Sequence, residues 1–152
     1  MNLRMAIAIV GIMLLDQSSK WWIEENMRLG ESIAVVSGVF HITHIHNPGA
    51  AFGIFPHQQY FFIFSAVLMA LVGLWAIKRF SHYGLFFVYG IVGMIAGALG
   101  NLIDRVRLSA VVDFLDFRIW PIFNVADIAI VCGAAAIVWA LWQDENGEKV
   151  EV

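Results

Sequence analysis

Charge and cysteine are both scarce in this sequence. Only 14% of its 152 residues are Asp, Glu, Lys or Arg, about half the share found in soluble domains. The single cysteine, Cys132, excludes an internal disulfide and a metal site made of cysteines alone. The formal net charge is -3, so the chain lacks the basic surface with which proteins bind nucleic acid. Intrinsic disorder is excluded too, because 61% of the residues are hydrophobic.

Long apolar runs are present instead, and the mean hydropathy is +0.78. Runs of about 20 residues, the length that crosses the hydrocarbon core of a bilayer, occupy residues 6–23, 60–77, 84–103 and 124–142. Helices satisfy their own backbone groups in lipid, so we predict an all-α membrane protein with four transmembrane helices. The tryptophans lie near the ends of these runs, as interfacial anchors do: Trp21, Trp22, Trp75, Trp120, Trp139 and Trp142. A cleaved signal peptide is a weaker interpretation of the first run, since no small-residue cleavage site follows it.

Two stretches outside the runs, residues 24–59 and 104–123, contain enough apolar residues to fold on the membrane surface. The first is rich in β-branched residues, which favours a short sheet. The second is expected to form a loop or helix on the same side. Basic residues divide four against four between the two sides, with a slight preference for cytoplasmic termini. We therefore predict one integral membrane domain over residues 1–152, with both stretches extracytoplasmic.

Two aspartates occupy places where an ionisable group is costly. Asp127 lies in the first turn of the last run, and Asp113 has apolar residues on both sides. Ionisable groups at membrane depth are functional candidates by default. Pro121 separates the two and breaks the direction of the chain, so a short return can bring Asp113 against Asp127.

Two carboxylates in contact in a poorly solvated place share a proton, which is how aspartic proteases activate water. Simpler roles remain open for both residues. Asn124 and Asp127 also fit the cap and third position of a helix start. Asp116 competes with Asp113 for the catalytic role, although it also fits a surface charge beside Arg118.

Further polar residues interrupt the apolar runs. Asp16 and Lys20 have the spacing and order of an ion pair on one helix face, and we interpret them as structural. Asn101, Asp104 and Arg105 close the third run, where they either terminate the helix or orient a substrate backbone. The sequence leaves both possibilities open.

Residues 47–53, which read Asn-Pro-Gly-Ala-Ala-Phe-Gly, form the third unusual stretch. Its small residues, Gly49 among them, allow a backbone or a ligand to approach closely. A loop packed against helix ends explains the same composition equally well.

The histidines give little support to a metal site. In a strand His44 and His46 share a face while His41 faces away, and no H-x-x-x-H spacing or acidic partner is nearby. Cys132 lies among small apolar residues and is expected to be a buried hydrophobic residue. We predict no metal and no other cofactor.

Five stretches together resemble one family. The chain is similar to lipoprotein signal peptidase, also called signal peptidase II, over nearly its whole length. Any one of these stretches is a weak signal, but five in the same order on four runs are specific. They are residues 16–20 (Asp-Gln-Ser-Ser-Lys), 47–53, 100–105 (Gly-Asn-Leu-Ile-Asp-Arg), 111–114 (Val-Val-Asp-Phe) and 123–127 (Phe-Asn-Val-Ala-Asp).

The resemblance implies an aspartic endopeptidase with Asp113 and Asp127 as its catalytic dyad. Its substrates would be prolipoproteins whose cysteine already carries diacylglycerol, cleaved immediately before that cysteine. The resemblance also implies a monomer in the bacterial inner membrane that contacts lipid and binds peptide-like inhibitors such as globomycin. The termini would be cytoplasmic and the active site extracytoplasmic, beside a sheet near residues 31–46.

The resemblance assigns roles to other polar residues as well. Positions that line the family's substrate and inhibitor pocket correspond to Asn47, Asn101, Arg105 and Asn124. The motif of the first helix corresponds to Asp16 and Lys20, and Gly49 and Asp104 lie within matched stretches.

A transporter or channel and a structural membrane subunit are the alternatives to a peptidase. In a small transporter or channel, Asp16 and Asp127 would carry protons or a cation, but such proteins tend to have repeats or broken helices, and none is visible here. In a structural membrane subunit every polar residue would serve helix packing. That hypothesis leaves two aspartates in apolar settings unexplained.

Overall fold

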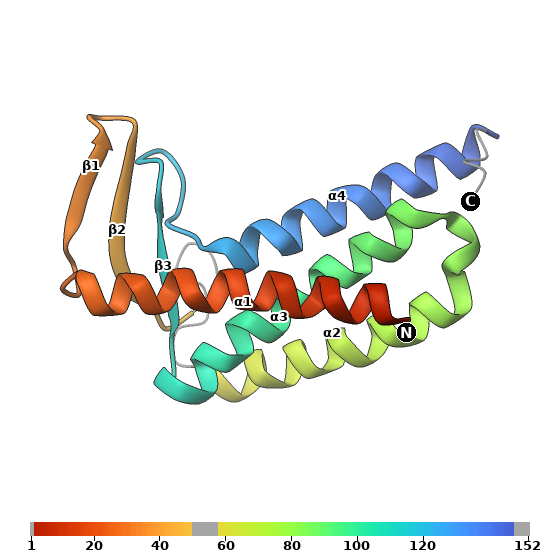
Figure 1. Cartoon of the computed structure of the whole chain (residues 1–152), viewed down its shortest axis with the longest axis horizontal. Helices are drawn as coiled ribbons and strands as arrows, with labels where there is room; N and C mark the ends of the chain where they lie inside the picture. Colours follow the sequence, from red (N-terminus) through yellow and green to blue (C-terminus); the bar gives the residue numbers. More distant parts are fainter. Residues whose placement is uncertain (1, 50–57, 148–152) are drawn as a thin grey trace.

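The computed structural model describes residues 2–49 and 58–147. Over these residues the chain forms four α-helices, one short 3-10 helix and a three-stranded sheet. The helices are α1 (Leu3–Asn26), α2 (Gln59–Phe80), η2 (Ser81–Tyr83), α3 (Leu85–Leu108) and α4 (Val125–Glu145), and the strands are β1 (Ser32–Val36), β2 (Phe40–Asn47) and β3 (Val111–Asp116). The sheet stands at one end of the helices, and the two termini lie at the other end (Figure 1).

Among the described residues, three helical stretches are long and apolar enough to cross a membrane: Gln59–Tyr83, Leu85–Leu108 and Val125–Glu145. They confirm the predictions for residues 60–77, 84–103 and 124–142, and the chain is a membrane-embedded protein. The prediction for residues 6–23 is confirmed as a helix, α1, but not as a span, because the polar residues 16–20 interrupt its apolar run.

Helix α3 is the central helix and packs against α1, α2 and α4. Most of its apolar stretch is buried, whereas α2 and α4 expose large apolar side chains on the outside, as contact with lipid requires. Small residues bring α3 and α4 together. Gly90 and Gly97 lie so close to backbone carbonyls of α4 that neither has room for a Cβ atom, as is usual for helices packed in membranes.

The sheet is antiparallel, with strand order β1-β2-β3. The prediction of a short sheet within residues 24–59 is confirmed by β1 and β2. The prediction of a loop or helix in residues 104–123 is wrong for residues 111–116, which pair with β2 as strand β3, while α3 continues to Leu108. This strand is almost wholly buried, so apolar residues lie on both of its faces and no alternation of apolar and polar residues marks it in the sequence. Ser109 has a φ of 58°, the left-handed turn that leads from α3 into β3.

The close packing of α3 on α4 predicts that Gly90→Ala destabilises the protein. A Cβ atom there would lie 2.6 Å from the carbonyl oxygen of Gly133, which moves only if the helices separate. We expect the free energy of unfolding to fall by about 1–3 kcal/mol, the usual cost of overpacking, measured as a lower unfolding temperature in detergent. Gly11→Ala is the matched control, because nothing lies within 4 Å of a Cβ atom in that position of α1. Equal unfolding temperatures for the two variants would contradict the packing.

Candidate active site

Asp113 lies in the middle of β3 with only 2% of its surface exposed. Its two carboxylate oxygens accept hydrogen bonds from the side-chain amides of Asn47 (2.9 Å) and Asn124 (2.7 Å). Burial raises the pKa of this carboxyl to about 7, and the nearby charge of Asp127 acts in the same direction. The two amides partly oppose that shift. Asp113 therefore exchanges its proton near neutral pH.

Asp127 is the third residue of α4, where it takes part in a capping box with Asn124. The side chain of Asn124 accepts a hydrogen bond from the backbone N–H of Asp127 (2.9 Å), and Asp127 Oδ2 accepts one from the backbone N–H of Asn124 (3.2 Å). Asp127 Oδ1 accepts a third bond from the amide of Asn101 (2.8 Å). The capping role expected from sequence is confirmed, but it leaves the carboxylate facing the cavity that Asp113 also lines.

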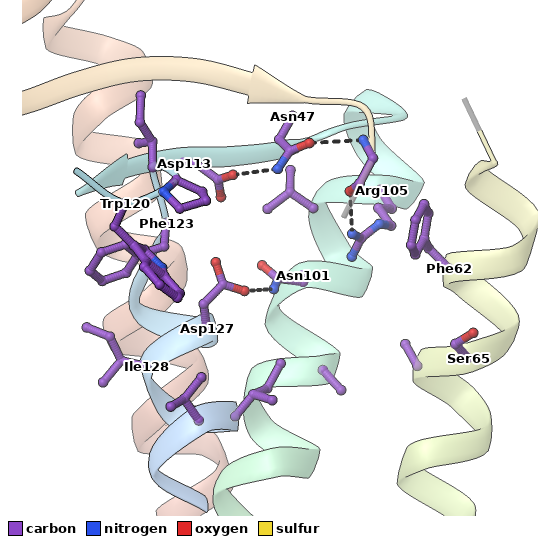
Figure 2. A pocket seen from close by; sticks show the side chains of 18 of the residues that line it. Asn47, Phe62, Ser65, Asn101, Arg105, Asp113, Trp120, Phe123, Asp127 and Ile128 are labelled. Carbon is purple, nitrogen blue, oxygen red and sulfur yellow. Dashed lines mark hydrogen bonds between the residues drawn. The ribbon is translucent and has the colours of Figure 1, made fainter. Parts of the chain in front are cut away.

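That cavity has a volume of about 800 Å³ and is lined by residues of β2, β3, α2, α3, α4 and the segment before α4. Asp113 and Asp127 project into it from β3 and α4, with Asn47 and Asn101 beside them (Figure 2). Its polar part lies at the sheet end. The remainder is apolar and includes Phe62, Ala66, Met69, Ile128 and Val131 of α2 and α4. The cavity can thus take an extended peptide beside an apolar group.

Arg105 lines the cavity opposite the carboxylates. Its guanidinium donates a hydrogen bond to the carbonyl oxygen of Gly49 (3.2 Å) and lies 4.6 Å from the ring centre of Phe62. Figure 2 shows Arg105 beside Phe62 of α2. No signal in the sequence selects Phe62, one of many aromatic residues in an apolar run. Of the stretch 47–53, residues 50–53 lie outside the described part of the chain.

Asp16, Lys20 and Asp104 form a buried ionic cluster next to the cavity. The Lys20 ammonium lies 2.9 Å from Asp16 Oδ2 and 2.8 Å from Asp104 Oδ2, which confirms the predicted Asp16–Lys20 pair. The amide of Gln17 bonds both carboxylates, at 3.0 Å and 3.1 Å. A glutamine within an apolar run was a signal for this contact that sequence reasoning left unused.

Asp116, the competitor of Asp113, lies apart from the cavity. Its carboxylate accepts hydrogen bonds from the Thr43 hydroxyl (2.8 Å) and the Arg118 guanidinium (2.9 Å), and it is not among the residues that line the cavity. The pairing with Arg118 agrees with the simpler role expected from sequence, but the carboxylate is buried and is not the surface charge that was predicted.

His44 and His46 lie on β2, and the single cysteine lies on α4. His44 and His46 share a face of β2, with ring centres 5.2 Å apart, as predicted. Within residues 2–49 and 58–147, no cluster of three or more His, Cys, Asp or Glu side chains could hold a metal ion. The prediction for Cys132 is wrong, because its side chain is exposed and lines the apolar part of the cavity. Small apolar neighbours in a membrane helix mark a lipid-facing or cavity-facing surface as readily as a core.

A family model described as signal peptidase (SPase) II matches residues 8–143. The chain belongs to the signal peptidase II family. It is 48% identical to the lipoprotein signal peptidase of Pelotomaculum thermopropionicum, with 92% of each chain covered, and 45% identical to that of Halothermothrix orenii, with 92% of this chain and 96% of the relative covered. A solved structure of a bacterial membrane enzyme superposes with a TM-score of 0.89 at 33% identity, covering 98% of this chain and 93% of the other. Membership of signal peptidase II decides against the transporter and structural-subunit hypotheses.

The raised pKa of Asp113 predicts that the stability of this signal peptidase II member depends on pH. The ordinary pKa is 3.8 and the folded value is about 7, so the folded protein retains a proton that the unfolded chain releases between those values. This contribution to stability is complete below about pH 4 and disappears as the pH rises through about 7. Three pKa units correspond to about 4 kcal/mol, an upper limit for the loss.

We expect Asp113→Asn to remove most of this pH dependence, measured as unfolding in detergent at several pH values between 4 and 8. Asp144→Asn, at an exposed position near the end of α4, is the control and should keep the wild-type slope. A slope in Asp113→Asn as steep as that of the control would contradict the assignment.

Proposed function

We propose that Asp113 and Asp127 are the catalytic dyad with which this membrane-embedded aspartic peptidase cleaves signal peptides from prolipoproteins. The observation that carries the proposal is the shared asparagine. The side-chain amide of Asn124 bonds Asp113, and its backbone N–H bonds Asp127, so one residue holds both carboxylates at the wall of one cavity. The curated relatives above are lipoprotein signal peptidases, which supplies the class of substrate.

The dyad hydrolyses the peptide bond with one ionised and one protonated carboxyl group. The ionised carboxylate takes a proton from water as the water oxygen bonds to the carbonyl carbon. The protonated carboxyl gives its proton to the carbonyl oxygen, which yields a tetrahedral diol. A proton then passes to the amide nitrogen, the carbon–nitrogen bond breaks, and the new carboxyl end and amine leave. The two groups titrate as one coupled pair.

The amide and guanidinium groups of the cavity hold the substrate. Asn47, Asn101 and Arg105 line the cavity and present donors around the carboxylates, suited to an extended peptide whose scissile carbonyl must meet the attacking water. Asn124, expected from the resemblance to line the same pocket, has no exposed surface and is not among the lining residues, so it acts through its bonds to the two carboxylates. The carbonyl oxygen of Gly49 accepts a hydrogen bond from Arg105, which holds Gly49 and the Arg105 guanidinium together at the cavity. Peptide-like inhibitors of the family, such as globomycin, would occupy the same donors.

The apolar part of the cavity receives the diacylglyceryl group on the cysteine that follows the cleaved bond. It lies between α2 and α4, whose outer surfaces expose large apolar residues suited to lipid contact. Acyl chains can therefore enter from the membrane while the peptide bond reaches the dyad at the sheet end of the helices.

The orientation in the membrane follows from the same arrangement. We infer that α1 is the fourth span, because it lies beside α3 and ends at the sheet (Figure 1). The last turn of α2 carries Lys78 and Arg79 at the end of the molecule where the termini lie, which favours a cytoplasmic location for that end. The sheet and the dyad then face the extracytoplasmic side of the bacterial inner membrane. One chain supplies all of the site residues, so a monomer suffices and residues 1–152 form one catalytic domain.

The dyad predicts that Asp113→Asn and Asp127→Asn each abolish processing. Removal of one member of an acid–base pair should lower the rate by at least about 10³-fold, measured as the mobility shift of a lipidated precursor on a gel. Asp144→Asn is the control, since it makes the same chemical change at an exposed position, and it should process the precursor at the wild-type rate. Full activity in either dyad variant would end the proposal.

The apolar part of the cavity predicts a preference for lipidated substrate. We expect a precursor with diacylglycerol on its cysteine to be cleaved at least about 100-fold more efficiently than the same precursor without it, because the acyl chains supply binding energy remote from the reacting bond. Gel-shift assays with the two precursors side by side measure the ratio.

A pair of α2 variants tests whether this cavity holds the acyl chains. Met69→Trp fills space at the apolar wall and should reduce the preference, while Leu71→Trp, on the exposed side of α2, should leave it unchanged. Equal preferences in the two variants would locate acyl recognition elsewhere.

A further inference from the structure

Lys20 is the most deeply buried charged side chain of α1, with none of its surface exposed. An ammonium group has three N–H donors and no acceptor, and each donor here has a partner. The partners are Asp16 Oδ2 (2.9 Å), Asp104 Oδ2 (2.8 Å) and Asn101 Oδ1 (2.9 Å). Lys20 does not line the cavity, so any effect on the reaction passes through these three groups.

The two carboxylate partners of Lys20 each hold the backbone next to one dyad residue. Asp16 Oδ1 accepts a hydrogen bond from the N–H of Ala126 (2.8 Å), the residue before Asp127. Asp104 Oδ2 accepts one from the N–H of Val112 (3.2 Å), the residue before Asp113. The ammonium thus lies between two carboxylates, and each of these fixes the strand or helix that carries one catalytic candidate.

The third partner of Lys20 determines which way an amide faces. Because the ammonium only donates, Asn101 must turn its oxygen toward Lys20, and its NH₂ group then faces away. That NH₂ group donates to Asp127 Oδ1 at 2.8 Å. The oxygen of Asn101 also accepts from the amide of Asn124 (3.1 Å), which bonds Asp113. With the opposite orientation, Asp127 would lose a donor and Lys20 would face a positive amide edge.

We infer that Lys20 is a positioning residue of the dyad, which sets the separation of Asp113 and Asp127 through Asp16 and Asp104 and the orientation of the Asn101 amide. The inference rests on the proposed dyad and deepens it. The simpler alternative is that the cluster only lets charged residues survive between helices. The two differ in what a variant changes, because a purely structural cluster alters folding and not the ionisation of the dyad.

The charge of Lys20 supplies a readout for this difference. Burial raises the pKa of Asp113, and the ammonium of Lys20 opposes that shift together with Asn47 and Asn124. Loss of the ammonium should therefore raise the pH at which the dyad first loses a proton. The acid limb of the pH profile of kcat/KM reports that step in the free enzyme.

The experiment compares Lys20→Met with two other variants of the full chain, assayed in detergent on lipidated precursor. The double variant Lys20→Met/Asp104→Asn keeps the formal charge of the cluster unchanged and guards against simple failure to fold. Arg107→Met is the matched control, because it breaks an exposed ion pair with Glu24 between the same two helices. Thermal unfolding is followed for all three.

For both Lys20 variants we expect kcat to fall by at least about 100-fold while KM changes by less than about threefold. The acid limb should move to higher pH in Lys20→Met and by less in the double variant, in which the charge of the cluster is unchanged. Arg107→Met should leave all three quantities near wild type. In an Asn101→Ala background, the factor by which Lys20→Met lowers kcat should be at least about tenfold smaller, because the contact of Lys20 with the Asn101 amide is already absent.

Several results would overturn the inference. One is a folded Lys20 variant with wild-type kcat and a wild-type acid limb. Another is a loss of activation free energy in Lys20→Met that adds fully to that of Asn101→Ala. A third is failure of both Lys20 variants to fold, which would make the cluster structural only. Activity in Asp113→Asn or Asp127→Asn would remove the dyad itself and the inference with it. Inactive dyad variants beside a normal Lys20→Met would overturn the inference alone.

Discussion

The ammonium of Lys20 is wholly buried where α1 meets α3, and a charge in that position persists only if every donor finds an acceptor. Its acceptors are side chains of α1 and α3 that in turn accept N–H groups of α4 and β3. The positions of four elements therefore depend on one cluster. Two of those elements, α4 and β3, carry Asp127 and Asp113. Replacing the cluster by apolar residues could give an equally stable bundle, but it would leave the first turn of α4 and the start of β3 without these hydrogen bonds.

The rest of the fold gives the cavity two different walls. At the sheet end, β3 follows α3 and pairs with β2, so Asp113 and Asn47 meet although they are far apart in sequence. Farther from the sheet, glycine-mediated contact holds α4 on α3, while α2 contributes Phe62 and Met69 from the other side. A polar site continuous with an apolar groove is what a bond between a peptide and a lipid-bearing cysteine requires.

Sequence reasoning was sound where chemistry is local and weak where it depends on distant partners. Apolar runs located all four helices, and the cost of an ionisable group in lipid selected Asp113 and Asp127. Strand β3 was missed because it is buried on both faces, so that apolar and polar residues do not alternate along it, and its partner lies some 70 positions earlier. The exposure of Cys132 was missed because helix periodicity does not tell lipid from core when both are apolar. Helical spacing gave the Asp16–Lys20 pair, but Asp104 and Asn101 come from another helix, and no spacing within one segment indicates that contact.

The capping role and the proposed catalytic role of Asp127 are compatible, because its hydrogen bonds serve both. The capping box fixes the side-chain oxygen of Asn124 on the N–H of Asp127, so the NH₂ group of Asn124 must face Asp113. Each of the four carboxylate oxygens of the pair accepts one donor, from Asn47, Asn101, the Asn124 side chain or the Asn124 backbone. Such donors favour ionised carboxylates, whereas burial and mutual repulsion favour protonated ones. Because the two tendencies oppose each other, a single shared proton is the state that we propose for the dyad, in which one group accepts a proton from water while the other donates to the carbonyl. Helix capping and the proposed catalytic role thus use the same bonds.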